Sequence, residues 1–138
     1  MKVLTNDCAI YLPILSGSKW YHIDMRQALS FTHAFRGIWT AVTTQPNLRF
    51  HVLIGSIILY AASYLRSSIA EILVLFLTIA LVMTVEMVNT AIEFACNAIT
   101  LKYNPYIKQA KDVSAGAVLM ATIFAIIIGL MIFIPKLI

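Results

Sequence analysis

The feature that most constrains this chain is a long apolar stretch, residues 69–99, which contains neither glycine nor proline. Its first part, residues 69–87, is long enough to cross the hydrocarbon core of a bilayer as a helix. No turn separates that part from the more polar part, which carries Glu86, Asn89 and Glu93. Ionisable groups in a spanning helix are energetically costly and usually functional. We therefore predict one continuous helix that carries a polar site.

Composition supports a membrane protein. The 138 residues are 61% hydrophobic and 12% charged, whereas soluble proteins are about 25% charged. A soluble domain of this size leaves roughly a third of its surface wet and could not hide so many apolar side chains. We interpret the net charge of +4 as basic flanks of membrane spans rather than as a nucleic-acid surface. The two cysteines lack metal-site spacing and predict neither a zinc site nor a disulfide framework.

The predicted fold class is an all-α membrane protein with an amino-terminal amphipathic surface helix and three transmembrane helices. Apolar residues recur at helical spacing in residues 25–43, with basic residues between them, which is typical of a helix lying in the membrane interface. Pro46 then disfavours continuation of that helix. The spans are expected at about residues 49–65, 69–99 and 114–134, the last ending at Pro135.

The segment before the surface helix, residues 1–24, is predicted to be an irregular or surface-lying extension that could contact a partner assembly. Its apolar run is interrupted by Pro13 and is too short to span. It also lacks the charge and cleavage-site pattern of a signal peptide.

Positive charge predicts the orientation. Eight of the ten lysines and arginines fall on the side of the amino terminus and of the loop before the third span, and only Arg66 and Lys136 fall on the other. This bias places the amino terminus in the cytoplasm of a multi-pass protein of a bacterial-type inner membrane. Glu86 and Glu93 then lie near the cytoplasmic boundary.

The acidic residues share one helical face. At 100° per residue, Glu86 and Glu93 lie about 20° apart around the axis, and Asn89 lies about 60° to one side. Two carboxylates in this arrangement could hold a metal, orient a hydroxyl group or do both, while the alternative is paired polar groups in helix packing. No phosphate-loop or GxGxxG motif is present.

A second polar group, Lys111 and Asp112, is expected at the start of the third span, where a helix amino terminus favours anions. Carboxylates hold Mg²⁺, cations neutralise phosphate, and an unliganded carboxylate can take a proton from a hydroxyl group. The pair predicts phosphate chemistry at the membrane surface together with Glu86, Asn89 and Glu93, and the further basic candidates are Arg26, Arg36 and Arg49. The alternative is that Lys111 and Asp112 only cap a helix.

Three ordered motifs resemble the small prokaryotic diacylglycerol kinase family. VEMVNTAIEFACNAI, residues 85–99, resembles the family pattern Glu-x-x-Asn-[Thr/Ser]-Ala-Ile-Glu, and AKDVSAGAVLMA, residues 110–121, resembles its second motif. FTHAFRGIWTA and NLRFH, in residues 31–51, resemble the surface helix and the entry to the first span. The resemblance covers residues 25–138.

The resemblance implies a homotrimeric lipid kinase that transfers the γ-phosphoryl group of ATP, with Mg²⁺, to a membrane lipid hydroxyl. It implies that Glu86 is the catalytic base, that Asn89 organises the site, and that Glu93 binds metal and nucleotide. The further nucleotide-binding positions that it implies are Arg26, His33, Gln45, Lys102, Tyr103, Asn104, Lys111 and Asp112.

Two positions depart from the family pattern. The family usually has a second metal-binding glutamate where this chain has Gln45, and a neutral amide brings an oxygen but no charge to Mg²⁺. Asn97 stands where some members have aspartate, and we expect it to lie beyond the main cluster.

Members of the family phosphorylate either diacylglycerol or undecaprenol, and AFRGI and NLRFH look closer to the undecaprenol group. Two other functions stay open at this point. One is a non-catalytic, kinase-like subunit of a larger membrane assembly. The other is a small transporter with a proton relay through Glu86 and Glu93.

Overall fold

The computed structural model describes the backbone of residues 21–138 and the side chains of residues 31–138. Most of the predicted extension, residues 1–24, therefore lies outside the described residues. All regular structure from residue 21 onward is helical: α1 (Tyr21–Thr44), α2 (Pro46–Tyr64), α3 (Ile69–Ile99) and α4 (Pro105–Leu137). This confirms the predicted all-α class.

The chain divides into two units, Met1–Phe35 and Arg36–Ile138, and the boundary falls within α1. Helix α1 begins at Tyr21, four residues before the predicted start of the surface helix. Phe31 and Phe35 are exposed on its part in the first unit, and Ile38 and Trp39 are exposed on its part in the second unit. The position of α1 at a membrane surface stays a prediction.

Local sequence explains where the three helices of the second unit begin. Pro46 is the first residue of α2 because its fixed φ suits a first turn and its missing N–H is not needed there. Ser68 and Glu71 form a capping box at the start of α3, after a corner at which Arg66 has a φ of 52°. Asn104 caps α4, and Pro105 follows it.

Helix α4 differs from the prediction at both ends. It begins at Pro105, nine residues before the predicted start of the third span at residue 114, and it includes Pro135. The helix continues through Pro135 to Leu137, while the end of the membrane span at Pro135 stays a prediction. Proline removes the hydrogen bond that its own N–H group would donate, but only two residues follow Pro135 in the helix, so little of the helix lies beyond the missing bond. The next residue, Lys136, instead makes an ion pair of 3.0 Å with Glu71 at the start of α3.

Two of the described helices, α3 and α4, are long and apolar enough to cross a membrane. Only 17% of the most apolar window of α3 is buried, and none of that of α4, so neither resembles the core helix of a soluble protein. Helix α2 does not reach the same hydropathy, because Asn47, Arg49 and His51 occupy its first turns. It is about 28 Å long at 1.5 Å per residue, and its role as a third span stays a prediction.

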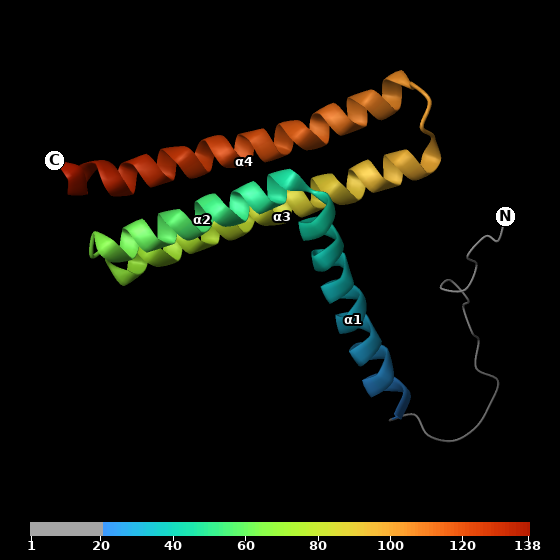
Figure 1. Cartoon of the computed structure of the whole chain (residues 1–138), viewed down its shortest axis with the longest axis horizontal. Coiled ribbons are helices and arrows are strands. Elements are labelled where there is room, and N and C mark those ends of the chain that lie inside the picture. The colour runs from blue at the N-terminus through green and yellow to red at the C-terminus, as the bar shows by residue number, and fades with distance from the viewer. Residues whose placement is uncertain (1–20) are drawn as a thin grey trace. The chain divides into compact units, whose positions relative to one another are not determined.

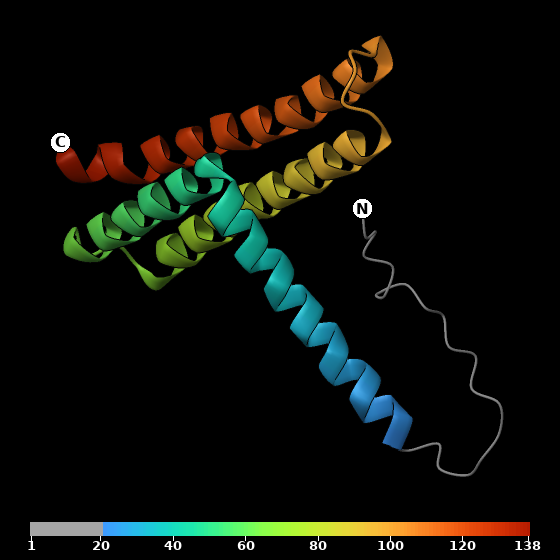
Figure 2. The same ribbon diagram turned by 45° about the vertical axis from the view of Figure 1, so that its right-hand side comes forward.

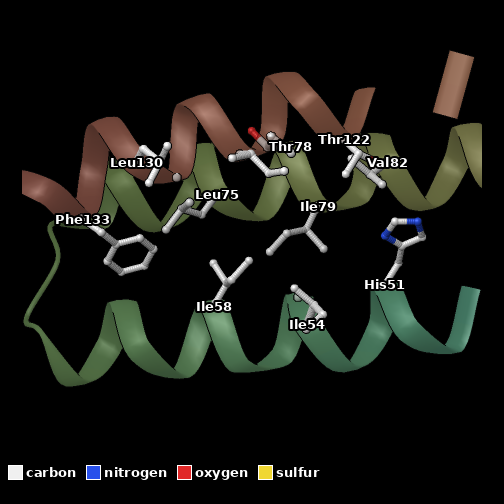
Figure 3. A pocket seen from close by; sticks show the side chains of 14 residues that line it. His51, Ile54, Ile58, Leu75, Thr78, Ile79, Val82, Thr122, Leu130 and Phe133 are labelled. Atoms are coloured by element: carbon white, nitrogen blue, oxygen red, sulfur yellow. The ribbon is translucent and has the colours of Figure 1, made fainter. Parts of the chain in front are cut away.

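Helix α3 packs against both α2 and α4. Figures 1 and 2 show α4 running antiparallel to α3 along its length, so the start of α4 lies beside the polar end of α3. The backbones of α2 and α3 approach closely at Gly55, where a Cβ atom would lie 2.8 Å from Cγ2 of Ile79. The three helices also line an apolar pocket of about 260 Å³ that is partly open at its side, and Gly55 and Ile79 belong to its lining (Figure 3).

Candidate functional site

Gln45 and Glu93 are brought together by the fold although 48 residues separate them. Gln45 precedes Pro46 and has extended backbone angles, and its side chain does not cap α2. Its amide Nε2 instead donates to Oε2 of Glu93 at 3.4 Å. Both side chains are half-buried, so a ligand can reach their oxygen atoms. The two residues that the family resemblance assigned to metal therefore form one contact.

Glu86 lies two turns before Glu93 on α3 and is only 2% exposed. Burying an ionised carboxylate is energetically costly unless a partner compensates it. Within the described part of the chain no ion pair to Glu86 is found. A carboxyl group kept buried in a spanning helix without a cationic partner is characteristic of a functional group rather than of a packing residue.

Asn89 is held by a residue of the neighbouring helix. The hydroxyl group of Ser114 in α4 donates to Oδ1 of Asn89 at 2.7 Å, and both side chains are buried. The carbonyl oxygen of Lys111 lies 2.9 Å from the same hydroxyl group. Ser114 was not among the predicted site residues, although its spacing of three residues from Lys111 places both on one helical face.

Asn97 belongs to the polar cluster, contrary to the expectation that it lies beyond it. Its Oδ1 accepts a hydrogen bond of 2.7 Å from Nζ of Lys111. Eleven residues separate Asn97 from Glu86, which returns the side chain to within about 20° of the same face. The expectation failed because it considered the distance along the helix and not the angle around it.

A polar pocket of about 410 Å³ adjoins this cluster between the end of α3 and the start of α4. Its volume lies in the range of small-molecule sites. Glu93 lies one helical turn from Asn97, which lines the pocket, so the Gln45–Glu93 contact is about 6 Å away along the helix axis. Five of the predicted nucleotide-binding residues also line it: Lys102, Tyr103, Asn104, Lys111 and Asp112.

The prediction that Lys111 and Asp112 lie at the amino terminus of a helix is wrong. Helix α4 begins at Pro105, so Lys111 and Asp112 lie in its second turn. At the true terminus, Oδ1 of Asn104 already accepts from the backbone N–H groups of Tyr106 and Ile107, at 2.9 and 3.4 Å. Asp112 forms an exposed ion pair with Lys108, four residues earlier. The pocket's positive charge therefore comes from side chains.

Two further basic candidates of the second unit, Arg36 and Arg49, do not line the pocket. Nη2 of Arg49 donates to the carbonyl oxygen of Thr43, near the end of α1. Arg36 is exposed on α1. His33 is exposed in the first unit, and the side chain of Arg26 lies outside the described residues, so their nucleotide roles stay predictions.

A family model described as prokaryotic diacylglycerol kinase matches residues 32–133. The chain belongs to the prokaryotic diacylglycerol kinase family. Among relatives, it is 43% identical to the undecaprenol kinase of Bacillus subtilis (strain 168) over 108 residues, which cover 78% of this chain and 88% of that protein. It is 40% identical to the diacylglycerol kinase of Synechocystis sp. over 110 residues, which cover 79% of this chain and 63% of that protein.

As a member of the prokaryotic diacylglycerol kinase family, the chain is a lipid kinase of the membrane. Membership implies a lipid substrate and ATP as the phosphoryl donor. The polar end of α3 and the pocket beside it lie within the matched residues, whereas Arg26 lies outside them. The two relatives are named as kinases of undecaprenol and of diacylglycerol, and both of these lipids are alcohols. A buried carboxyl group beside a basic pocket is consistent with phosphorylation of such a lipid.

Proposed function

We propose that this lipid kinase transfers the γ-phosphoryl group of ATP to the hydroxyl group of undecaprenol at the cytoplasmic face of the inner membrane. The observation that carries the proposal is the contact of Gln45 with Glu93, one helical turn from a basic pocket of about 410 Å³. Undecaprenol is favoured over diacylglycerol because the B. subtilis undecaprenol kinase matches over 88% of its length.

In the proposed reaction Glu86 is the general base. The lipid oxygen attacks the γ-phosphorus, its proton passes to the Glu86 carboxylate, and the bond between the γ-phosphorus and the ADP oxygen breaks. Burial of Glu86 keeps water from competing with the lipid hydroxyl as the acceptor. Asn89, on the same face, organises the site.

The pocket suits the phosphates and the nucleoside of ATP. Lys111, whose Nζ donates to Oδ1 of Asn97 at 2.7 Å, presents its positive charge at a residue one helical turn from Glu93. Lys102 adds a second charge, and Tyr103 and Asn104 add an aromatic ring and polar atoms to the same lining. Asp112 lines the same pocket and is held there by Lys108.

The donor set of Gln45 and Glu93 fits Mg²⁺. Protein-bound Mg²⁺ is usually held by one or two carboxylates together with water and substrate phosphates. Glu93 would hold the ion through its carboxylate and Gln45 through its amide oxygen. Bound there, Mg²⁺ would neutralise charge on the β- and γ-phosphates.

We also propose a homotrimer in which neighbouring protomers complete the site. Large apolar side chains such as Leu77, Leu81 and Phe124 are exposed on α3 and α4, and each can pack against lipid or against another protomer. Crosslinking in membranes, read by the mass of the product, tests this assembly. A protein that crosslinks no further than a dimer would contradict it.

Phosphorylation of lipid by the purified protein tests the proposed reaction. Mixed micelles containing undecaprenol or diacylglycerol receive γ-labelled ATP and Mg²⁺, and labelled lipid is separated by thin-layer chromatography. We expect faster labelling of undecaprenol. In Glu86→Gln, which lacks the base, we expect lipid phosphorylation to be at least about 100-fold slower. Glu71→Gln, the same substitution at the far end of α3, is the control and should retain activity. Equal labelling by the wild type and Glu86→Gln would contradict the proposal.

A further inference from the structure

Lys108 lines the polar pocket between α3 and α4, although it was not among the predicted site residues. Its ammonium group forms an ion pair with Oδ2 of Asp112, four residues later on the same helix. Nζ of Lys111 has a different partner, because it donates to Oδ1 of Asn97 in α3. Lys111 is therefore bonded to a neutral amide and keeps its charge for a ligand, whereas Lys108 is paired with a carboxylate.

Stability does not account for the ion pair between Lys108 and Asp112. Each side chain is 60% exposed, and an exposed pair four residues apart on a helix contributes little to the free energy of unfolding. Both partners do line the pocket, so the pair changes the surface that a bound molecule meets. Its loss should therefore affect ligand binding more than the unfolding temperature.

The pair also sets the charge balance of the pocket. The charged residues of the lining are three lysines and one aspartate, a net charge of +2: Lys102, Lys108, Lys111 and Asp112. Without Lys108 the net charge falls to +1, and the carboxylate of Asp112 loses its positive partner. An unpaired carboxylate repels phosphate groups at short range, even in water-like surroundings. Lys108 therefore makes an acidic residue compatible with a pocket that binds phosphates.

Pairing also affects how Asp112 can bind a nucleotide. A carboxylate accepts hydrogen bonds and donates none, so Asp112 suits the O–H and N–H groups of a nucleoside rather than its phosphates. Lys108 holds one oxygen, Oδ2, which restricts rotation of the side chain and leaves Oδ1 able to accept from a ligand. A released carboxylate would sample several orientations and lose more entropy on binding.

We infer that Lys108 is a positioning residue for the nucleotide: it holds and neutralises the Asp112 carboxylate, which accepts hydrogen bonds from the nucleoside. Lys102 and Lys111 are then left to bind the phosphates. The inference rests on the proposed function, in which this pocket takes ATP. Because Lys108 acts through Asp112 and not on the reacting atoms, its removal should weaken nucleotide binding and leave the chemical step almost unchanged.

Kinetics of the purified protein in mixed micelles, together with equilibrium binding of MgADP, test this inference. Lys108→Gln should raise the KM for ATP about three- to tenfold, as expected for one unpaired charge roughly 6 Å from one or two phosphate charges, with kcat changed less than about twofold. MgADP affinity, which requires no lipid, should fall by the same factor. Lys108→Arg keeps the charge and should restore most of the loss.

Lys136→Gln is the matched control, because it breaks the other ion pair between a lysine and a carboxylate, Lys136 with Glu71, at the far end of α3 and α4. It should leave the KM for ATP and the affinity for MgADP unchanged. Unchanged nucleotide binding in Lys108→Gln, an effect confined to kcat, or an equal loss in Lys136→Gln would overturn the inference.

A double mutant tests whether Lys108 acts through Asp112. In an Asp112→Asn protein the lysine has no carboxylate to hold, and its long side chain is released to solvent, where salt screens its charge. Adding Lys108→Gln should then change MgADP affinity by less than about twofold. A loss as large as in the wild-type background would mean that Lys108 binds the nucleotide by itself and would overturn the inference. A wild type that binds MgADP but phosphorylates no lipid would instead contradict the proposed function, so the two failures are distinguishable.

Discussion

Restoring a carboxylate at residue 45 is the sharpest test of the proposed metal site. In the structure, Nε2 of Gln45 lies 3.4 Å from Oε2 of Glu93. In Gln45→Glu, a negatively charged carboxylate replaces the amide that donates to Glu93, and it lies at about the same distance from Oε2 of Glu93. The two charges would repel each other by about 1 kcal/mol in water-like surroundings and about 5 kcal/mol at the effective dielectric constant near a protein surface.

A divalent cation bound between the two carboxylates is attracted by both charges, and this attraction exceeds the repulsion between them. An added attraction of about 1.4 kcal/mol already tightens Mg²⁺ binding by roughly tenfold. We therefore expect the Mg²⁺ concentration for half-maximal activity to fall by about tenfold in Gln45→Glu at fixed ATP concentration.

The assay is lipid phosphorylation at a series of free Mg²⁺ concentrations. Gln109→Glu, on the exposed surface of α4, adds the same charge away from Glu93 and is the matched control. It should leave the half-maximal concentration unchanged. An unchanged Mg²⁺ dependence in Gln45→Glu would refute the assignment of a metal to this contact, and an equal shift in both variants would mean that only net charge matters.

Three further predictions concern other contacts. Asn97→Leu removes the tether of Lys111 and should raise the KM for ATP about fivefold with little change in kcat; a selective fall in kcat would argue against a nucleotide role for this contact. Gly55→Leu forces side-chain atoms against Ile79 and should destabilise the protein by about 1–3 kcal/mol in thermal unfolding, whereas Gly129→Leu, which meets open space, should not; equal stability of the two would contradict the close approach of α2 and α3. Glu71→Gln breaks a partly exposed ion pair with Lys136 and should lower the unfolding temperature only slightly without changing activity; a loss of activity would show that the far end of α3 affects the site.

Helix α3 shows how much of the site follows from local sequence. A stretch without glycine or proline, begun by Ser68 and Glu71, determines one helix over residues 69–99, as predicted. Helical periodicity then places Glu86, Asn89 and Glu93 on one face wherever the helix lies. The motifs in this helix and in α4 also indicated the lipid kinase family, which the comparison confirms.

Contacts between helices could not be predicted in the same way. The bonds of Ser114 to Asn89 and of Lys111 to Asn97 depend on how α4 packs against α3, and no local pattern contains that register. The start of α4 at Pro105 was also missed, because hydropathy marks the membrane-spanning part of a helix and not its polar first turns.

The sequence alone determined a membrane-embedded helical chain, its polar helix face and its kinase family, because hydropathy and helical periodicity are properties of neighbouring residues. Only the tertiary structure decided that Gln45 meets Glu93 and that Ser114 holds Asn89. The two partners of each pair lie on different segments of the fold, and the packing of helices against one another sets their distances.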